Sequence, residues 1–155
     1  MTTEITSTTQ NPWIFNSEEI SSFPDGVIGF VYLITNLLSG KQYYGKKQIY
    51  FKKTTLKTVT LKSGVKKKKK IRTLIDSDWK DYYGSCTDLS LDILNLGIEN
   101  FRREILMFCY SLSELSYMEL RYQVVNDVLL YPDKFYNSWL SARCRRSHLL
   151  KTIQT

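Results

Sequence analysis

The residues best suited to chemistry are a pair of tyrosines on either side of a predicted turn. Tyr32 and Tyr43 are expected on paired strands, where both hydroxyls can point to one face. A free phenol has a pKa of about 10, so a tyrosine acts as a base only where nearby cations favour the phenolate. Lys46, Lys47 and Arg72 are candidate sources of that charge. The alternative is that both are ordinary strand aromatics, as most of the 11 tyrosines must be.

A helical carboxylate is predicted at the edge of a buried helix face. The spacing of Ser111 and Glu114 is that of a capping box, which predicts the start of a helix. The predicted apolar face of this helix consists of Leu115, Met118, Tyr122 and Val125. Glu119 begins a neighbouring stripe, at the edge of the buried face. The alternative is a solvated carboxylate with no functional role.

Histidine and cysteine chemistry is disfavoured. The single histidine, His148, lies near the end of the chain, beyond the other candidate residues. The three cysteines lack the paired spacings of zinc sites, and their odd number argues against a disulfide framework. We therefore expect reduced thiols.

Positive charge is concentrated in one part of the chain. The net charge is +7, and 13 of the 22 basic residues lie between Lys41 and Arg72, a stretch without Asp or Glu. Such a block indicates a surface that faces phosphates, and its alternative is a solvated charged loop. This charge favours a polyanionic partner, with a merely solvated basic surface as the alternative.

These residues need a small sheet to position them. The run 27–35, rich in β-branched and aromatic residues, predicts a strand, and 42–45 predicts a second strand that returns after a turn at 36–40. The segment 101–109 predicts a third, central or nearly central strand. The expected fold is α+β, with a small three-stranded antiparallel sheet flanked by helices.

A basic hairpin is predicted as an insertion at about 50–75. The residues 54–61 alternate in polarity, 62–64 supply a turn, and 65–71 return through five consecutive lysines. Like charges side by side repel each other, so such a hairpin is better suited to a phosphate surface than to isolation.

Two further helices are expected before the third strand. A short helix is predicted at 79–83, capped by Ser77 or Asp78. Thr87 is predicted to cap a second helix that ends near Gly97.

The order of these segments resembles the GIY-YIG endonuclease family. The resemblance rests on Phe30-Val31-Tyr32, then Tyr43-Tyr44-Gly45, then FRREIL, a helix with Glu119, and a final Tyr136-Asn137. It covers about two thirds of the chain. The runs DWKDYYGSC, IENFRREIL and YNSWLSARCRR are similar to small phage homing-type, Seg-like endonucleases, which implies a phage origin.

The resemblance implies Mg²⁺-dependent hydrolysis of DNA phosphodiester bonds. Glu119 would bind a single Mg²⁺, with Mn²⁺ as an alternative, and Tyr32 and Tyr43 would provide a general base and a group that holds water or phosphate. Asn137 would fix the carboxylate or the phosphate, although a turn-forming Asn is an alternative. The residues expected to contact DNA are Lys46, Lys47, Lys53, Lys66, Lys67, Lys68, Lys69, Lys70, Arg143, Arg145 and Arg146.

The catalytic arginine of the family is the main departure. The family places it on a helix soon after the second motif, where this chain carries lysines and the inserted hairpin. Arg72 is the only arginine before Arg102, so it is the predicted catalytic arginine, with Lys53 as a substitute.

The chain is expected to divide into a polar, mostly irregular extension at 1–26 held by Trp13, a nuclease domain at 27–140, and a basic tail at 141–155. No signal peptide or membrane span is visible, so a cytoplasmic protein with DNA as partner is expected, with a homodimer on DNA left open. One alternative is a catalytically weak or inactive nucleic-acid-binding phage protein. Another is a structural or inhibitory phage protein that binds host RNA or an acidic protein.

Overall fold

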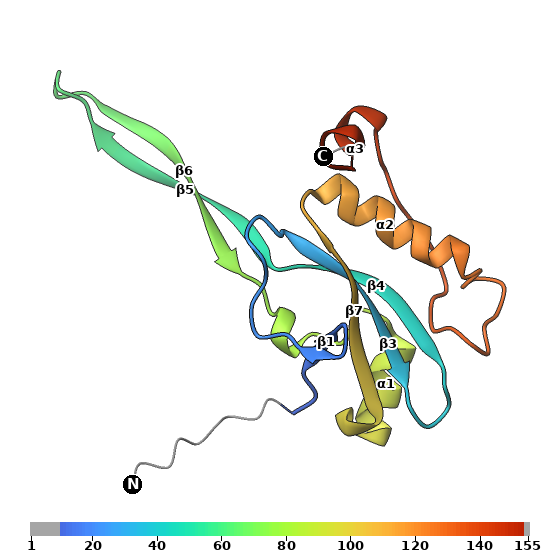
Figure 1. Ribbon diagram of the computed structural model, residues 1–155. Helices are drawn as coiled ribbons and strands as arrows, with labels where there is room; N and C mark the ends of the chain where they lie inside the picture. Colours follow the sequence, from blue (N-terminus) through green and yellow to red (C-terminus); the bar gives the residue numbers. More distant parts are fainter. Residues whose placement is uncertain (1–9, 154–155) are drawn as a thin grey trace, which may run out of the picture.

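The computed structural model describes residues 10–153, which form a mixed sheet with helices on both faces and one projecting hairpin (Figure 1). The strands of the sheet lie in the order β2-β1-β7-β3-β4. Their bounds are β1 Trp13–Phe15, β2 Glu18–Glu19, β3 Gly29–Asn36, β4 Gln42–Gln48 and β7 Phe101–Cys109. The remaining elements are β5 Tyr50–Thr60, β6 Lys66–Asp76, α1 Thr87–Leu96, α2 Leu112–Val125, α3 Arg146–Ile153 and the short 3₁₀ helices η1 Trp79–Asp81 and η2 Ile98–Asn100.

The predicted α+β fold and its antiparallel strands β4, β3 and β7 are confirmed. β3 pairs antiparallel with both β4 and β7, so it is covered on both edges. All eight of its residues are buried, which explains why its sequence is a nearly continuous apolar run rather than an alternating one. β7 is the middle strand of the five, as its apolar second half predicted.

The sheet is larger than the three strands expected, because β1 and β2 extend it beyond β7. β1 pairs parallel with β7, and β2 pairs antiparallel with β1. The Trp13 side chain is 1% exposed, and its indole N–H donates to the carbonyl oxygen of Trp79 at 2.7 Å. The burial of this large ring and the hydrogen bond of its indole N–H hold the short strand in place. The strand has too few residues to show a periodic pattern in the sequence.

The two faces of the sheet have separate cores. On one face α2 packs over Val31 and Cys109 through Leu115 and Met118. The other face carries the larger core, whose central residues are Trp13, Phe30, Tyr32, Ile34, Trp79 and Leu89.

Helix α2 starts at the predicted capping box, where the Glu114 N–H donates to Ser111 Oγ at 3.1 Å. Val125, predicted on its buried face, is 72% exposed because the helix ends there.

The remaining helices follow the predicted order with small shifts at their starts. The predicted helix at 79–83 is the shorter 3₁₀ helix η1, and α1 is preceded by Cys86 as its N-cap, with Thr87 in its first turn. Gly97 follows α1, as expected, with φ of 88°, a conformation that glycine adopts without strain. Within the part of the chain that the structure describes, no helix has the length and apolarity required to cross a membrane.

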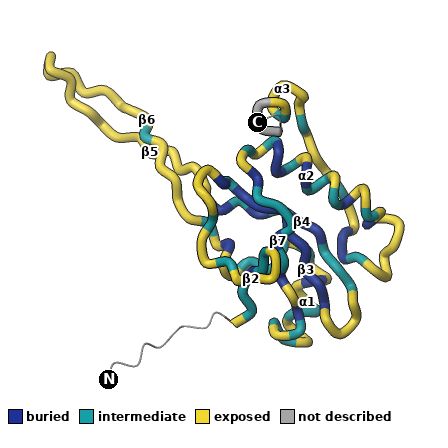
Figure 2. Tube along the Cα trace, viewed as in Figure 1, coloured by how far each residue is buried: buried dark blue, intermediate teal, exposed yellow. Residues whose placement is uncertain are grey.

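The predicted basic hairpin is present and leaves the body of the protein. β5 and β6 pair only with each other, in a two-stranded antiparallel ribbon separate from the main sheet. Figure 2 shows that the ribbon is exposed along almost its whole length, in contrast to the buried strands beside it. β4 leads into the ribbon through Ile49 alone, so the ribbon continues directly from the edge of the sheet.

Candidate active site

A cavity of about 440 Å³ lies beside edge strand β4 and gathers four of the five predicted catalytic residues. Tyr32 on β3, Tyr43 on β4, Glu119 on α2 and Asn137 in the segment after α2 all line it. Glu119 and Asn137 lie far along the chain from the two tyrosines, so only the folded sheet and helix bring the four together. The cavity is therefore the candidate active site.

The phenols and the carboxylate come from opposite faces of the sheet and meet across Gly45. Tyr32 and Tyr43 belong to the core on the sheet face opposite α2. Tyr44 points to the other face, and alternate residues of a strand share a face, so Lys46 also points toward α2, where it meets Glu119. Gly45 pairs with Tyr32 across β3 and β4. A Cβ atom at Gly45 would overlap the Tyr32 hydroxyl, so the missing side chain makes room for the phenol.

Both phenols are protonated in the resting site. The Tyr32 and Tyr43 ring centroids lie 6.2 Å apart. Burial raises the pKa of Tyr32 well above its usual 10 and also raises the pKa of Tyr43, where a hydrogen bond with Ser85 partly opposes the shift. Tyr43 is therefore the easier of the two to ionise.

Glu119 is paired with a lysine. Lys46 Nζ lies 3.1 Å from Glu119 Oε2 and donates to Ser116 Oγ at 3.0 Å, so two residues of α2 hold the ammonium. Burial raises the pKa of Glu119, while Lys46 acts in the opposite direction. Among the residues that the structure describes, Lys46 is the one cationic side chain that lines the cavity.

Asn137 contacts the backbone of β4 rather than Glu119. Its Oδ1 accepts from the Tyr44 N–H at 3.0 Å, and its Nδ2 donates to the Tyr44 carbonyl at 2.8 Å. Two backbone bonds of Gln42, with Lys134 and Tyr136, extend this pairing along the strand. Asn137 thereby fixes the edge strand that carries Tyr43 and Lys46, and it is not a turn residue.

The loop after η1 forms another wall of the cavity and was not assigned a role from the sequence. Tyr82, Ser85 and Cys86 line the cavity, and the Tyr82 ring centroid lies 6.0 Å from that of Tyr32. The run DWKDYYGSC carried the resemblance to small phage enzymes, which was the available signal. Gln123 of α2 also lines the cavity, and its side-chain amide donates to the Tyr44 carbonyl at 3.2 Å.

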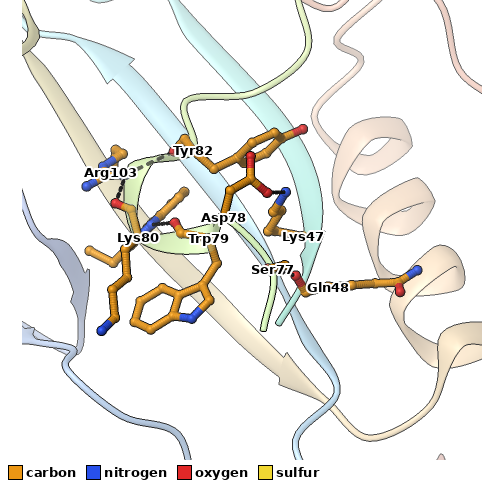
Figure 3. Close-up of polar contacts among 9 residues, drawn as sticks. Lys47, Gln48, Ser77, Asp78, Trp79, Lys80, Tyr82 and Arg103 are labelled. Carbon is orange, nitrogen blue, oxygen red and sulfur yellow. Dashed lines mark hydrogen bonds and ion pairs between the residues drawn. The ribbon is translucent and has the colours of Figure 1, made fainter. Parts of the chain in front are cut away.

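Buried charges anchor this loop (Figure 3). Arg103, 1% exposed, donates from Nη1 to the carbonyl oxygens of Lys80 and Tyr82, each at 2.9 Å. Lys47 Nζ lies 2.5 Å from Asp78 Oδ1 and 3.8 Å from the centroid of the Tyr82 ring. These tertiary contacts leave no periodic pattern in the sequence, so the position of Tyr82 could not be read from it.

Several predicted residues lie elsewhere. Arg72 is exposed on β6 opposite Thr54, and Lys53 is on β5, so the ribbon carries both away from the lining of the cavity. The Lys47 side chain is 10% exposed and is engaged by Asp78, which disfavours contact with a phosphate. The remaining residues expected to contact DNA are exposed, on β6 or around the start of α3: Lys66, Lys67, Lys68, Lys69, Lys70, Arg143, Arg145 and Arg146.

The donor set of the cavity fits an ion that keeps most of its water. Within residues 10–153 the structure has no group of three His, Cys, Asp or Glu side chains that could form an all-protein metal cage. Of the described residues that line the cavity, Glu119 is the one that presents a carboxylate, with phenol and hydroxyl oxygens nearby. Mg²⁺ binds proteins in this manner, through one or two carboxylates and several retained waters.

The fold is consistent with that of GIY-YIG nucleases, and comparison with protein families identifies this class. The family described as putative endonuclease segE, GIY-YIG domain, matches residues 13–140, from the first residue of β1 to beyond Asn137. The chain belongs to the GIY-YIG endonuclease family. Comparisons with curated proteins and with solved structures gave no match.

Proposed function

We propose that this endonuclease hydrolyses DNA phosphodiester bonds with one divalent ion, Mg²⁺ or Mn²⁺, held by Glu119. The observation that carries the proposal is the single cavity lined by Tyr32, Tyr43, Lys46 and Glu119. A GIY-YIG domain implies a DNA substrate, and the resemblance to small phage endonucleases supports a phage-encoded, homing-type enzyme that acts in the host cytoplasm.

Tyr43 is the general base in this proposal. It is more exposed than Tyr32, and its pKa is raised less strongly because Ser85 opposes the effect of burial. As the phenolate, Tyr43 takes a proton from water, the water oxygen attacks phosphorus, and the bond from phosphorus to the 3′ oxygen breaks, with the leaving oxygen taking a proton from solvent. The products are a 5′-phosphate and a 3′-hydroxyl. Tyr32 stays protonated and donates a hydrogen bond within the site.

Lys46 takes the place of the family's catalytic arginine. Its ammonium already lies in the cavity, 3.1 Å from Glu119, whereas Arg72 projects with the ribbon. A cation here offsets the negative charge that develops on the phosphate and favours the phenolate of Tyr43. A divalent ion bound to Glu119 supplies further positive charge to the phosphate and the leaving oxygen.

A second candidate is a nucleic-acid-binding protein that has retained the scaffold and lost turnover. The observation in its favour is the lining of the cavity, which among the described residues includes a lysine but no arginine. Lysine offers one point charge in place of the bidentate fork of arginine, which weakens support for a phosphate transition state.

Cutting of supercoiled plasmid with Mg²⁺ separates the two functions. We expect the wild-type chain to cut, Glu119→Gln to bind DNA without cutting, and Glu104→Gln, a carboxylate paired with Arg102 on β7, to cut like wild type. Loss of cutting by Glu119→Gln with retained binding supports the enzyme. A purified wild-type chain that binds plasmid and leaves it intact across Mg²⁺ and Mn²⁺ titrations establishes the binding protein instead.

A further inference from the structure

The β5-β6 ribbon is the most basic part of the molecule and, within the described chain, pairs with no other strand. All 11 residues of β5 are exposed, and in β6 only Ile71 is half-buried. A two-stranded ribbon is marginally stable alone, and directly paired lysines such as Lys57 and Lys69 repel each other. The composition of the ribbon is therefore suited to a polyanion that surrounds it.

The pairing register places positive charge on both faces of the ribbon. Successive side chains of a strand point to opposite faces, so alternate lysines of the run 66–70 separate. Through its cross-strand pairs, one face carries Lys52, Lys66, Lys68, Lys70 and Arg72. The opposite face carries Lys53, Lys57, Lys67 and Lys69. A ribbon lying flat on one phosphate backbone would need only one basic face.

The dimensions of the ribbon match the major groove of B-DNA. At about 3.3 Å per residue, 11 residues extend about 36 Å, close to one helical turn. The major groove is about 12 Å wide, accepts a two-stranded ribbon, and has a phosphate backbone on each side. The major groove of double-stranded RNA is too deep and narrow for side chains to read.

Small polar and apolar side chains lie between the lysines. Thr55 lies between Lys53 and Lys57 on β5, and Thr58 and Val59 follow Lys57. Threonine hydroxyls can hydrogen-bond base edges, and methyl groups can contact the methyl of thymine. These residues provide groups for reading bases where the lysines hold the backbones.

We propose that the ribbon enters the major groove of duplex DNA and extends the contact about one helical turn to one side of the cleaved bond. The proposal rests on the proposed function for the position of the cleaved bond. β4, which carries Tyr43 and Lys46 of the cavity lining, continues through Ile49 into β5. The ribbon therefore starts where the strand that borders the cavity ends, and its tip lies a ribbon length further away. Such contacts would give the enzyme sequence preference that the cavity alone lacks.

Three matched triple variants test the two-faced contact. Each variant replaces three basic residues by Gln. The first changes one face of the ribbon, at Lys66, Lys68 and Lys70, and the second changes the opposite face, at Lys57, Lys67 and Lys69. The third, the α3 variant, changes Arg143, Arg145 and Arg146 near α3. Binding to a mixed-sequence duplex of about four helical turns is measured against salt concentration. We expect both ribbon variants to reduce the slope of log K against log salt by about 2 to 3, similarly for the two faces. The α3 variant should change it less. Loss on one face alone contradicts groove insertion and indicates a flat contact with one backbone.

A shortened ribbon tests the groove and the footprint. Leu56 and Lys70 are directly paired, so Asn-Gly can replace residues 57–69 as a two-residue turn. We expect this variant to lose about half a helical turn of hydroxyl-radical protection at one end. The wild type should displace the major-groove dye methyl green, and the shortened variant should displace less. An unchanged footprint, displacement of netropsin without methyl green, or stronger competition by double-stranded RNA would overturn the inference.

The same variants separate this inference from the proposed function. If the wild type cuts plasmid and the ribbon variants keep its salt slope and footprint, the groove inference fails and the nuclease stands. If the wild type does not cut but the ribbon variants lose slope and footprint, the nuclease fails and the groove contact stands.

Discussion

Lys46 Nζ on β4 lies 3.1 Å from Glu119 Oε2 on α2, which joins the edge of the sheet to the helix inside the cavity. The Glu119 side chain is 16% exposed, and burial raises its pKa while Lys46 lowers it. A carboxylate that binds a divalent ion must be ionised, so Lys46 keeps Glu119 in the form the ion requires. It also competes with the ion for the same oxygen.

Replacing Lys46 should therefore separate metal binding from turnover. We expect Lys46→Gln to bind Mn²⁺ about fivefold more tightly at pH 8, because a pair of this exposure opposes metal binding by about 1 kcal/mol after solvent screening. Cutting should fall about 100-fold through loss of positive charge at the phosphate. Calorimetric titration and plasmid cutting measure the two effects. Lys41→Gln, whose ammonium lies over Tyr136, is the control, and weaker metal binding by Lys46→Gln contradicts the competition.

The ionisation of Tyr43 should set the alkaline dependence of the rate. Burial raises its pKa above 10, so the phenolate is scarce at neutral pH and increases tenfold for each pH unit. We expect log kcat to rise with a slope near 1 from about pH 7 to 9. Tyr43→Phe should lower kcat by about 10² to 10⁴ and remove the slope.

Tyr32→Phe provides the comparison for this pH profile. It removes a hydrogen bond of a phenol that stays protonated, so the rate should fall while the slope is retained. A profile in which Tyr32→Phe loses the slope and Tyr43→Phe keeps it would reverse the assignment of the base.

Gly45 should be sensitive to a single added methyl group. In Gly45→Ala the Cβ would overlap the Tyr32 hydroxyl and also approach the Tyr32 ring, so the phenol must move. We expect a loss of cutting of about 100-fold with retained DNA binding, because active-site misplacement by about 1 Å has this effect. Circular dichroism monitors the fold. Full activity of Gly45→Ala would exclude the close approach.

Asn137 should act through β4. Asn137→Ala removes both hydrogen bonds to the Tyr44 backbone, although the Tyr44 carbonyl keeps Gln123 as a donor. We expect a loss of about 2 kcal/mol in unfolding free energy, measured by denaturant titration, and a fall in kcat with little change in DNA affinity. Asn137→Asp keeps the acceptor for the Tyr44 N–H and should restore part of the stability. A change in DNA affinity with unchanged stability would indicate direct contact with the phosphate.

Most of the sheet could be predicted because its signals are local. The apolar run of β3, the capping box before α2 and the glycine after α1 each depend on neighbouring residues. The candidate cavity was anticipated through Tyr32, Tyr43 and Glu119, because strand pairing and helix periodicity limit where those residues lie. The three-residue strand β1 escaped prediction because its stability comes from Trp13 and a parallel partner distant in sequence.

The order of basic residues along the chain does not predict which of them lies in the cavity. That order favours Arg72, the first arginine after the second motif, but Arg72 belongs to the ribbon, which carries it outward. Lys46 reaches Glu119 because it points toward α2, and Lys47 on the opposite face meets Asp78. Adjacent residues of one strand thus have separate environments, which only the packed helix and loop reveal.

The most direct test of the site is where a bound ion lies. Mn²⁺ broadens NMR signals of nearby nuclei, so titration of isotope-labelled protein locates it without a reaction. We predict that the first signals to broaden belong to Tyr43, Lys46, Glu119 and Tyr32, and that Glu119→Gln abolishes this broadening at the same Mn²⁺ concentration. Broadening centred on another region, or the same pattern in Glu119→Gln, would contradict a metal-dependent site built from these phenols and this carboxylate.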